Sequence, residues 1–128
     1  MTRDGLAMST ALTDTSLTWY IWGYAVDDNF EGCEWDESKS EQNLADRGYD
    51  YDFASRVFEG AYMEREQLRP DDGERRFIVV GEVDGFVIRV VWTPRGRVRR
   101  IISSRRAKIR EAEKYDGYRQ TTKRQPKE

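Results

Sequence analysis

The fold is decided by one stretch, FIVVGEVDGFVIRVVWTPRGRVRRIIS, which runs from Phe77 to Ser103. Three runs in it, Phe77–Val80, Phe86–Thr93 and Arg97–Ser103, hold the apolar and β-branched residues that are typical of strands. Asp84-Gly85 lies between the first two runs and is the usual signal of a two-residue hairpin turn. Pro94-Arg-Gly96 marks the second turn. The stretch therefore predicts an antiparallel meander of three strands.

Helices are expected on both sides of this meander. A helix is predicted over 37–47, because Asp36 is a good N-cap and Gly48 stands just past the end. A second, shorter helix is predicted over 51–59, and Tyr62–Gln67 is a candidate fourth strand. A helical pattern resumes over Ser104–Tyr115. The expected fold class is α+β: a small antiparallel sheet of three to five strands, with two N-terminal helices and one C-terminal helix.

The 128 residues suit a single domain, and 16 of them are aromatic, which supports a packed core. Residues 1–16 are rich in Thr and Ser and are expected to form a flexible leader. The aromatic segment Thr18–Val26 is a candidate extra strand, so the domain is expected over 17–116, followed by a polar tail over 117–128. The expected core residues are Val57, Phe58, Phe77, Val79, Val87, Ile88, Val90, Ile101 and Ile102.

The composition excludes several classes of function. Cys33 is the single cysteine, so no disulfide framework exists. The chain has no His, which argues against a zinc cluster and excludes any mechanism that uses an imidazole base. No apolar run approaches the roughly 18 residues of a membrane span, and the N-terminus does not look like a signal peptide. We therefore expect a cytoplasmic protein that uses neither a metal nor a cofactor.

The net charge of −2 hides a strong asymmetry along the chain. Residues 1–60 carry 13 acidic and 4 basic side chains, whereas residues 61–128 carry 11 acidic and 18 basic ones. Between Arg89 and Arg110 there are 9 basic residues and no acidic one. Eight of these 9 are Arg, whose planar fork suits phosphate oxygens. The stretch indicates a polyanionic or acidic partner, or else a basic surface balanced by the acidic half of the chain.

Several segments, taken in order, resemble the BrnT family of bacterial toxins, small ribonucleases related in fold to RelE and ParE. They are Glu34-Trp35-Asp36 with Lys39 and Asn43, Gly48, Phe53-Ala54 with Val57-Phe58, Glu74 with Arg76, Gly81, Thr93 with Arg95, Arg100-Ile-Ile-Ser103 with Arg105-Arg106-Ala107 and Glu111, and Tyr115. The resemblance covers about residues 33–115. It implies a βααβββα-type core, cleavage of RNA without a metal, and a BrnA-like antitoxin. Such antitoxins usually carry a ribbon-helix-helix that binds operator DNA through the toxin–antitoxin complex.

The chain departs from the family pattern at two places. The family typically has Lys-His-Gly at the end of the first helix, where this chain has Asp46-Arg47-Gly48. A His or Tyr commonly precedes the Thr of the third strand, where this chain has Trp92. Both departures concern groups that could move protons during RNA cleavage.

The chemistry of RNA cleavage points to particular residues. Arg100 and Arg105 are the first candidates to hold the scissile phosphate, with Arg105 expected at the start of the last helix, where free N–H groups favour an anion. Ser103 could add a hydroxyl donor, and Arg76 is a third candidate clamp. Lys39 is the motif residue whose pKa neighbouring arginines could lower enough for proton transfer.

Further candidates are one carboxylate and a set of substrate-binding residues. Glu74 is the best carboxylate candidate for a base, and Trp92 would suit stacking on an unpaired base. The other expected substrate-binding residues are Arg47, Arg95 and Arg106.

Each assignment has a structural alternative. Arg76 and Arg100 could pair with Glu74, Glu82 or Glu111 across the sheet. Ser103 could cap the last helix, Trp92 could belong to the core, and Lys39 could be a solvated side chain.

Three functions remain open from the sequence. The first is a toxin that cleaves RNA through attack of the ribose 2′-hydroxyl. The second is a catalytically degenerate module of the same family that binds RNA or an antitoxin without cleavage. The third is an interaction protein whose segment Trp19–Tyr24 adds a strand to the sheet of a partner.

Overall fold

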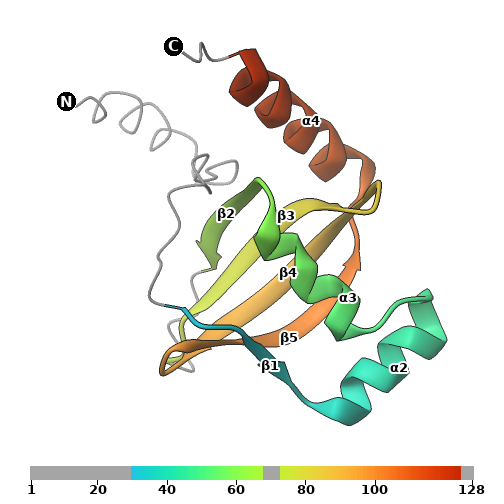
Figure 1. Cartoon of the computed structure of the whole chain (residues 1–128), viewed down its shortest axis with the longest axis vertical. Coiled ribbons are helices and arrows are strands. Elements are labelled where there is room, and N and C mark those ends of the chain that lie inside the picture. The colour runs from blue at the N-terminus through green and yellow to red at the C-terminus, as the bar shows by residue number, and fades with distance from the viewer. Residues whose placement is uncertain (1–29, 68–72, 125–128) are drawn as a thin grey trace.

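The computed structural model describes residues 30–67 and 73–124, with side chains as far as residue 120. Five strands form one sheet in the order β1-β5-β4-β3-β2 (Figure 1). Their bounds are β1 Cys33–Trp35, β2 Tyr62–Gln67, β3 Arg76–Val83, β4 Phe86–Arg95 and β5 Val98–Arg106. Strands β2 to β5 are antiparallel neighbours, so the expected meander is confirmed. The sheet as a whole is mixed, because β1 runs parallel to β5.

Strand β1 is a short element that the residue pattern did not predict, although the family resemblance implied a strand before the two helices. Its three residues lie opposite Arg99–Ile101, and the backbone bond from Arg99 N to Gly32 O (2.9 Å) extends the pairing. A strand of three residues has no readable alternation, so only its distant partner reveals it. The expected leader over 1–16 and extra strand over 18–26 lie outside the described residues.

The β3–β4 turn forms as the sequence predicts. Asp84 and Gly85 both have positive φ, at +50° and +87°, as a type I′ hairpin requires. This turn matches the right-handed twist of the strands that it joins. Thus Asp84-Gly85 fixes the register of β3 on β4, in which Val83 lies opposite Phe86.

Helix α2, Glu37–Arg47, has the predicted bounds and caps. The Asp36 carboxylate accepts hydrogen bonds from the backbone N–H groups of Ser38 and Lys39, and Gly48 adopts φ +89° at the other end. Most of α2 is exposed, since Ser40 and Asn43 are its buried residues. These two hold the following turn, because Asn43 Nδ2 donates to Tyr49 O (3.0 Å) and Ser40 Oγ accepts from Tyr51 N (2.9 Å).

The second predicted helix divides into two pieces. Helix α3 covers Tyr51–Ser55, and the 3-10 helix η3 covers Arg56–Glu59. Both pieces pack on one face of the sheet, which we call the helix face (Figure 1).

The last helix differs from the prediction at both ends. Helix α4 runs over Ile109–Arg124 instead of beginning at Ser104, because β5 continues to Arg106. The segment Ser103–Arg106 pairs with β4, and Ser104 Oγ lies 2.8 Å from the Tyr49 hydroxyl in the core. Long-range pairing therefore overrides the local helical pattern. The helices in the described part of the chain are not long and apolar enough to cross a membrane.

The core has two layers, one on each face of the sheet. The larger layer lies on the helix face and includes Val57, Val79, Ile88, Val90 and Ile101, all expected and all buried. The other expected residues, Phe58, Phe77, Val87 and Ile102, are half-buried. The core also contains residues that were not expected there, namely Tyr49, Tyr51, Tyr62, Ile78 and Val80, and it contains Trp92, for which a core position was the structural alternative. The smaller layer joins Met63 and Val80 to Tyr115 and Tyr118 of α4.

Candidate functional site

The pairing of β4 and β5 places three predicted catalytic residues on one face of the sheet. Arg105 lies opposite Arg89, Ser103 opposite Val91 and Arg100 opposite Thr93. Directly opposite residues share a face, and neighbours along a strand alternate. Trp92 and Ile101 lie in the core of the helix face. Arg100, Ser103 and Arg105 therefore lie on the face opposite α3.

A β-bulge makes this arrangement possible. Arg100 and Ser103 are three residues apart, so regular alternation would place them on opposite faces. The partner of β4 shifts from Ser103 at Val91 to Ile101 at Trp92, which leaves Ile102 as the extra residue of β5. The Tyr51 hydroxyl donates to the Ile102 carbonyl (3.3 Å) and supports the bulge from α3. Because Ile102 is the extra residue at this point of β5, the side chains of Arg100 and Ser103 lie on the same face of the sheet.

Arginines of β3 and β4 join the same face. Arg76 precedes Phe77, whose ring stacks on Trp92 in the helix-face core, so Arg76 points the other way. The same alternation places Arg89 and Arg95 of β4 on this face too. We call this surface the basic face and define it by six residues, Arg76, Arg89, Arg95, Arg100, Ser103 and Arg105. The basic face thus contains four of the five predicted catalytic residues and one predicted substrate-binding residue, Arg95.

Each arginine of the basic face is paired with a carboxylate. Glu74 lies 3.1 Å from Arg76 and 3.5 Å from Arg95. Glu34 lies 3.0 Å from Arg100, because β1 places it directly opposite that residue. Pairing was a structural alternative from the sequence, and for Arg76 the partner Glu74 is confirmed. For Arg100 the partner is Glu34, which was not among the carboxylates considered.

Glu111 holds the remaining two arginines of the face. Its carboxylate accepts one hydrogen bond from each terminal nitrogen of Arg105, both at 3.0 Å. It also accepts from the backbone N–H of Lys108 (2.8 Å) and lies 3.8 Å from Arg89 Nε. Partial burial raises the pKa of the Glu111 carboxyl, but the hydrogen bonds from Arg105, together with its other contacts, lower that pKa overall. Three glutamates therefore pair with the five arginines of the basic face, so the face keeps an excess of positive charge.

The predicted setting of Arg105 and the predicted capping role of Ser103 are wrong. Both residues lie inside β5, and α4 begins only at Ile109. The helix N-terminus therefore does not adjoin Arg105 along the chain, and Ser103 cannot cap the helix. At the start of α4 the backbone N–H of Lys108 donates to the Glu111 carboxylate and not to Ser103.

Lys39 and Trp92 are not assembled with the basic face. Lys39 is exposed in the first turn of α2 and forms no ion pair within the described ranges. Trp92 is 3% exposed, lies against Phe30 and Phe77, and donates from Nε1 to Glu64 (2.9 Å). Both residues thus occupy the structural roles that the sequence left open, and a buried Trp92 offers no free ring to a base.

Arg99 is a buried cation that sequence reasoning counted among the surface arginines. It is 8% exposed, and its guanidinium lies 4.2 Å from the centre of the Phe58 ring and 5.0 Å from that of Trp92. Burial raises the pKa of the neighbouring Glu64 carboxyl. The hydrogen bond from Trp92 and the positive charge of Arg99 offset part of this rise. Strand alternation with the apolar Ile101 was the signal that could have placed Arg99 inside.

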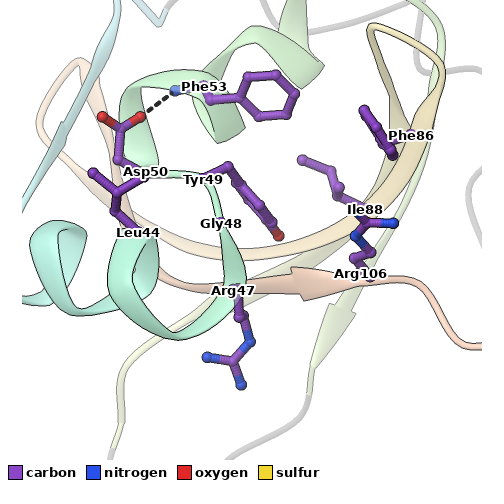
Figure 2. Close-up of a pocket in the computed structure, with 9 residues that line it drawn as sticks. All are labelled: Leu44, Arg47, Gly48, Tyr49, Asp50, Phe53, Phe86, Ile88 and Arg106. Atoms are coloured by element: carbon purple, nitrogen blue, oxygen red, sulfur yellow. Dashed lines mark hydrogen bonds between the residues drawn. The ribbon is translucent and has the colours of Figure 1, made fainter.

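Arg47 and Arg106, two predicted substrate-binding residues, line a hollow on the helix face (Figure 2). The hollow has a volume of about 360 Å³ and lies between the end of α2 and the end of the sheet at which β4 begins and β5 ends. We call it the Phe86 pocket; the lining residues that matter here are Leu44, Arg47, Tyr49, Phe53, Phe86 and Arg106. In the described part of the chain no carboxylate lies within ion-pair distance of Arg47 or Arg106. Arg47 and Arg106 therefore differ from the arginines of the basic face, each of which is paired with a carboxylate.

Within the described ranges, no group of three or more His, Cys, Asp or Glu side chains is arranged to hold a metal ion. Burial raises the pKa of the Cys33 thiol, which packs against the core on the helix face. The charged chemistry of the described site is therefore that of guanidinium and carboxylate groups.

Comparison with known proteins identifies one family. The family model described as "Ribonuclease toxin, BrnT, of type II toxin-antitoxin system" matches residues 35–111, which is more than half of the chain. The matched range begins in β1, ends in the first turn of α4 and contains the whole basic face. No curated protein matches the chain.

Proposed function

Because the chain belongs to the BrnT family of type II toxin–antitoxin ribonuclease toxins, we propose that its basic face cleaves RNA without a metal ion. The reaction is attack of a ribose 2′-hydroxyl on the adjacent phosphate. The observation that carries the assignment of the site is the bulge at Ile102, which aligns Arg100 with Ser103 and Arg105 on one face.

The arginines supply charge stabilisation. Arg100 and Arg105 hold the non-bridging oxygens and stabilise the phosphorane that forms as the O2′–P bond is made. Ser103 donates its hydroxyl to the same phosphate, and Arg76 is a third clamp. Arginine keeps its proton at any ordinary pH, so these side chains do not transfer protons.

Proton removal is assigned to Glu74. Hydrogen bonding to Arg76 lowers the pKa of this carboxyl, which keeps it in the unprotonated form that a general base needs but weakens it as a base while that bond is in place. The P–O5′ bond then breaks, and the departing oxygen takes a proton from solvent. The products are a 2′,3′-cyclic phosphate and a free 5′-hydroxyl.

RNA must displace the carboxylates that hold the arginines at rest. The Arg100 and Glu34 side chains are 29% and 43% exposed, and those of Arg105 and Glu111 are 26% and 22% exposed. An exposed single-bonded pair such as Arg100 with Glu34 contributes about 0–1 kcal/mol, so a phosphate can replace it at modest cost, whereas the bidentate Arg105–Glu111 pair is harder to displace.

A toxin of this family works with a protein antitoxin, and we propose a BrnA-like one with a ribbon-helix-helix domain. The complex would bind operator DNA. Purification of the chain with its co-expressed antitoxin, followed by operator binding of the complex, tests this partner. An antitoxin without a ribbon-helix-helix would contradict it.

The proposed chemistry is tested by the ends of the RNA fragments. The purified full chain is incubated with single-stranded RNA in the presence of EDTA, and the fragment ends are analysed. We expect 2′,3′-cyclic phosphate ends, and no cut at positions that carry a 2′-deoxyribose. Cleavage that stops in EDTA, or that continues at 2′-deoxy positions, would refute the mechanism. RNA that is bound but never cut would indicate a binding module.

A further inference from the structure

The Phe86 pocket is the second place where predicted substrate residues meet, and the reaction on the basic face does not use it. Leu44 and Phe86 at its rim are 50% and 44% exposed, although both are large apolar side chains. With Ile109 they are the exposed large hydrophobic residues of the described part. Aromatic side chains beside cations are the groups on which the bases of single-stranded nucleic acids stack.

The floor of the pocket is rigid. Ile88 is fully buried, and the Tyr49 hydroxyl is fixed by its 2.8 Å bond to Ser104. The Asp50 carboxylate is engaged by the backbone N–H of Phe53 (3.0 Å), shown as a dashed line in Figure 2. Thus Asp50 caps α3, and the pocket is already formed before a ligand arrives.

The cations of the pocket are placed for an anionic, planar ligand. The Arg106 guanidinium lies 4.5 Å from the centre of the Phe86 ring, which makes a stacked platform of charge and aromatic surface. Figure 2 shows Arg106 beside Ile88, whereas Arg47 points outward from the rim. A ring that lies on Phe86 would leave its phosphate outside the pocket, beside Arg106.

The edge of the sheet connects this pocket to the basic face. Strand β1 pairs with β5 only over Arg99–Ile101, so in the described part no strand covers β5 beyond Ile101. Arg105 and Arg106 are consecutive at that open edge and point to opposite faces. A polyanion bound at Arg105 can therefore pass over the edge and meet Arg106 on the other side.

We propose that the Phe86 pocket is a nucleobase subsite, which stacks a base of the RNA strand next to the scissile phosphate on Phe86 and Arg106. This inference rests on the proposed function, since the strand is the one held by the basic face. The volume of about 360 Å³ lies near the lower end of the usual range for small-molecule sites, about 300–1,000 Å³. It suits one base rather than a helix of a partner protein.

The test measures binding of a labelled single-stranded RNA to the full chain by fluorescence anisotropy. The variants Phe86→Ala and Arg106→Gln remove the platform, and Ile109→Ala and Arg110→Gln are controls with an exposed apolar side chain and an exposed cation outside the pocket. We expect Phe86→Ala to weaken binding about five- to 100-fold, as loss of one base stack does. Arg106→Gln should also weaken it, and the controls should not. Thermal unfolding verifies that each variant is folded.

A second readout separates this subsite from the basic face. Nucleoside 5′-monophosphates are titrated into the isotope-labelled chain, and we expect shifts of the Phe86 and Arg106 amide signals that persist in Arg100→Gln/Arg105→Gln. RNA that is bound but not cut by the wild type would refute the proposed function alone. Pocket variants that bind RNA as the controls do would overturn the subsite alone. Loss of antitoxin binding in those variants, with RNA binding intact, would make the pocket a protein interface and also overturn it.

Discussion

Glu111 occupies the position on Arg105 that a phosphate needs. Its two carboxylate oxygens each accept one bond from the guanidinium, which is the bidentate geometry that Arg also forms with phosphate. The same carboxylate holds Arg89 at 3.8 Å. At rest, therefore, an internal anion fills the strongest anion site of the basic face.

Glu111→Gln should raise the affinity for RNA. The amide still accepts the Lys108 N–H but no longer competes as an anion, so we expect a gain of up to about fivefold. Anisotropy with a single-stranded RNA measures it, and Glu113→Gln, exposed on the same helix, removes an equal charge as the control. Equal gains in both variants would mean that Glu111 acts only through net charge.

Glu64 makes stability depend on pH in the opposite sense to the usual carboxyl. Burial raises its pKa above the ordinary 4.5, so its contribution is fully present below 4.5 and is lost as the pH rises through the raised pKa. Glu64→Gln stays neutral and can still accept the Trp92 hydrogen bond. We expect its free energy of unfolding to fall less between acidic and neutral pH than that of the wild type. Urea unfolding across this range measures the difference, with the exposed Glu59→Gln as control. Identical pH profiles for Glu64→Gln and the wild type would contradict the assignment.

Among the elements, β5 shows best what local sequence can and cannot predict. Its apolar residues predicted the strand, and the motif around Arg100 and Arg105 supplied the candidate functional residues. The β-bulge at Ile102 could not be predicted, because it depends on pairing with β4 and on the Tyr51 hydroxyl. The extension to Arg106 was missed for a similar reason, since Ser104 is held by Tyr49, 55 residues away.

The helices follow the same rule. The bounds of α2 were predictable because Asp36 and Gly48 act within the helix itself. Strand β1 was not, because its three residues gain stability only from β5. Strand β1 also positions Glu34 opposite Arg100. The sequence alone therefore could not predict that Glu34 is the partner of Arg100.

The contact between β3 and η3 depends on Gly81. A Cβ atom at this position would lie 2.6 Å from Val57 Cγ2 and 3.0 Å from Tyr62 Cβ. We expect Gly81→Ala to lower the free energy of unfolding by about 1–3 kcal/mol through overpacking. Urea unfolding measures it. The control Gly60→Ala meets nothing within 4 Å and should leave stability unchanged or slightly raised. Similar values for the two variants would refute the close packing of β3 on η3.

Across the whole molecule, the charge asymmetry of the sequence is partly an internal balance. Glu31 and Glu34 of the acidic half pair with Arg97 and Arg100 of the basic stretch. Glu74 and Glu111, from the basic half, pair with three further members of the stretch, Arg89, Arg95 and Arg105. The acid-free run Arg89–Arg110 thus has carboxylate partners before β1, in β1, before β3 and in α4. The balanced surface is therefore present, and the anion site stays a prediction for the same residues.

RNA binding should therefore depend on salt through a small number of residues. Arg100→Gln removes one phosphate contact and should reduce the slope of log affinity against log salt by about one. Arg97→Gln, whose side chain is exposed on the β4–β5 turn, serves as the matched control and should leave the slope unchanged. Titrations at several salt concentrations measure it. Equal slopes for both variants would mean that RNA binds elsewhere.

The most direct test of the account is the single-turnover rate of RNA cleavage for Arg100→Gln/Arg105→Gln beside Arg97→Gln/Arg110→Gln. Both variants lose two positive charges, but only the first removes guanidinium groups from the basic face. We predict that the first loses at least about 100-fold in rate, as removal of one transition-state donor does, while the second cleaves like the wild type. Equal rates in the two variants would contradict the claim that the basic face is the active site.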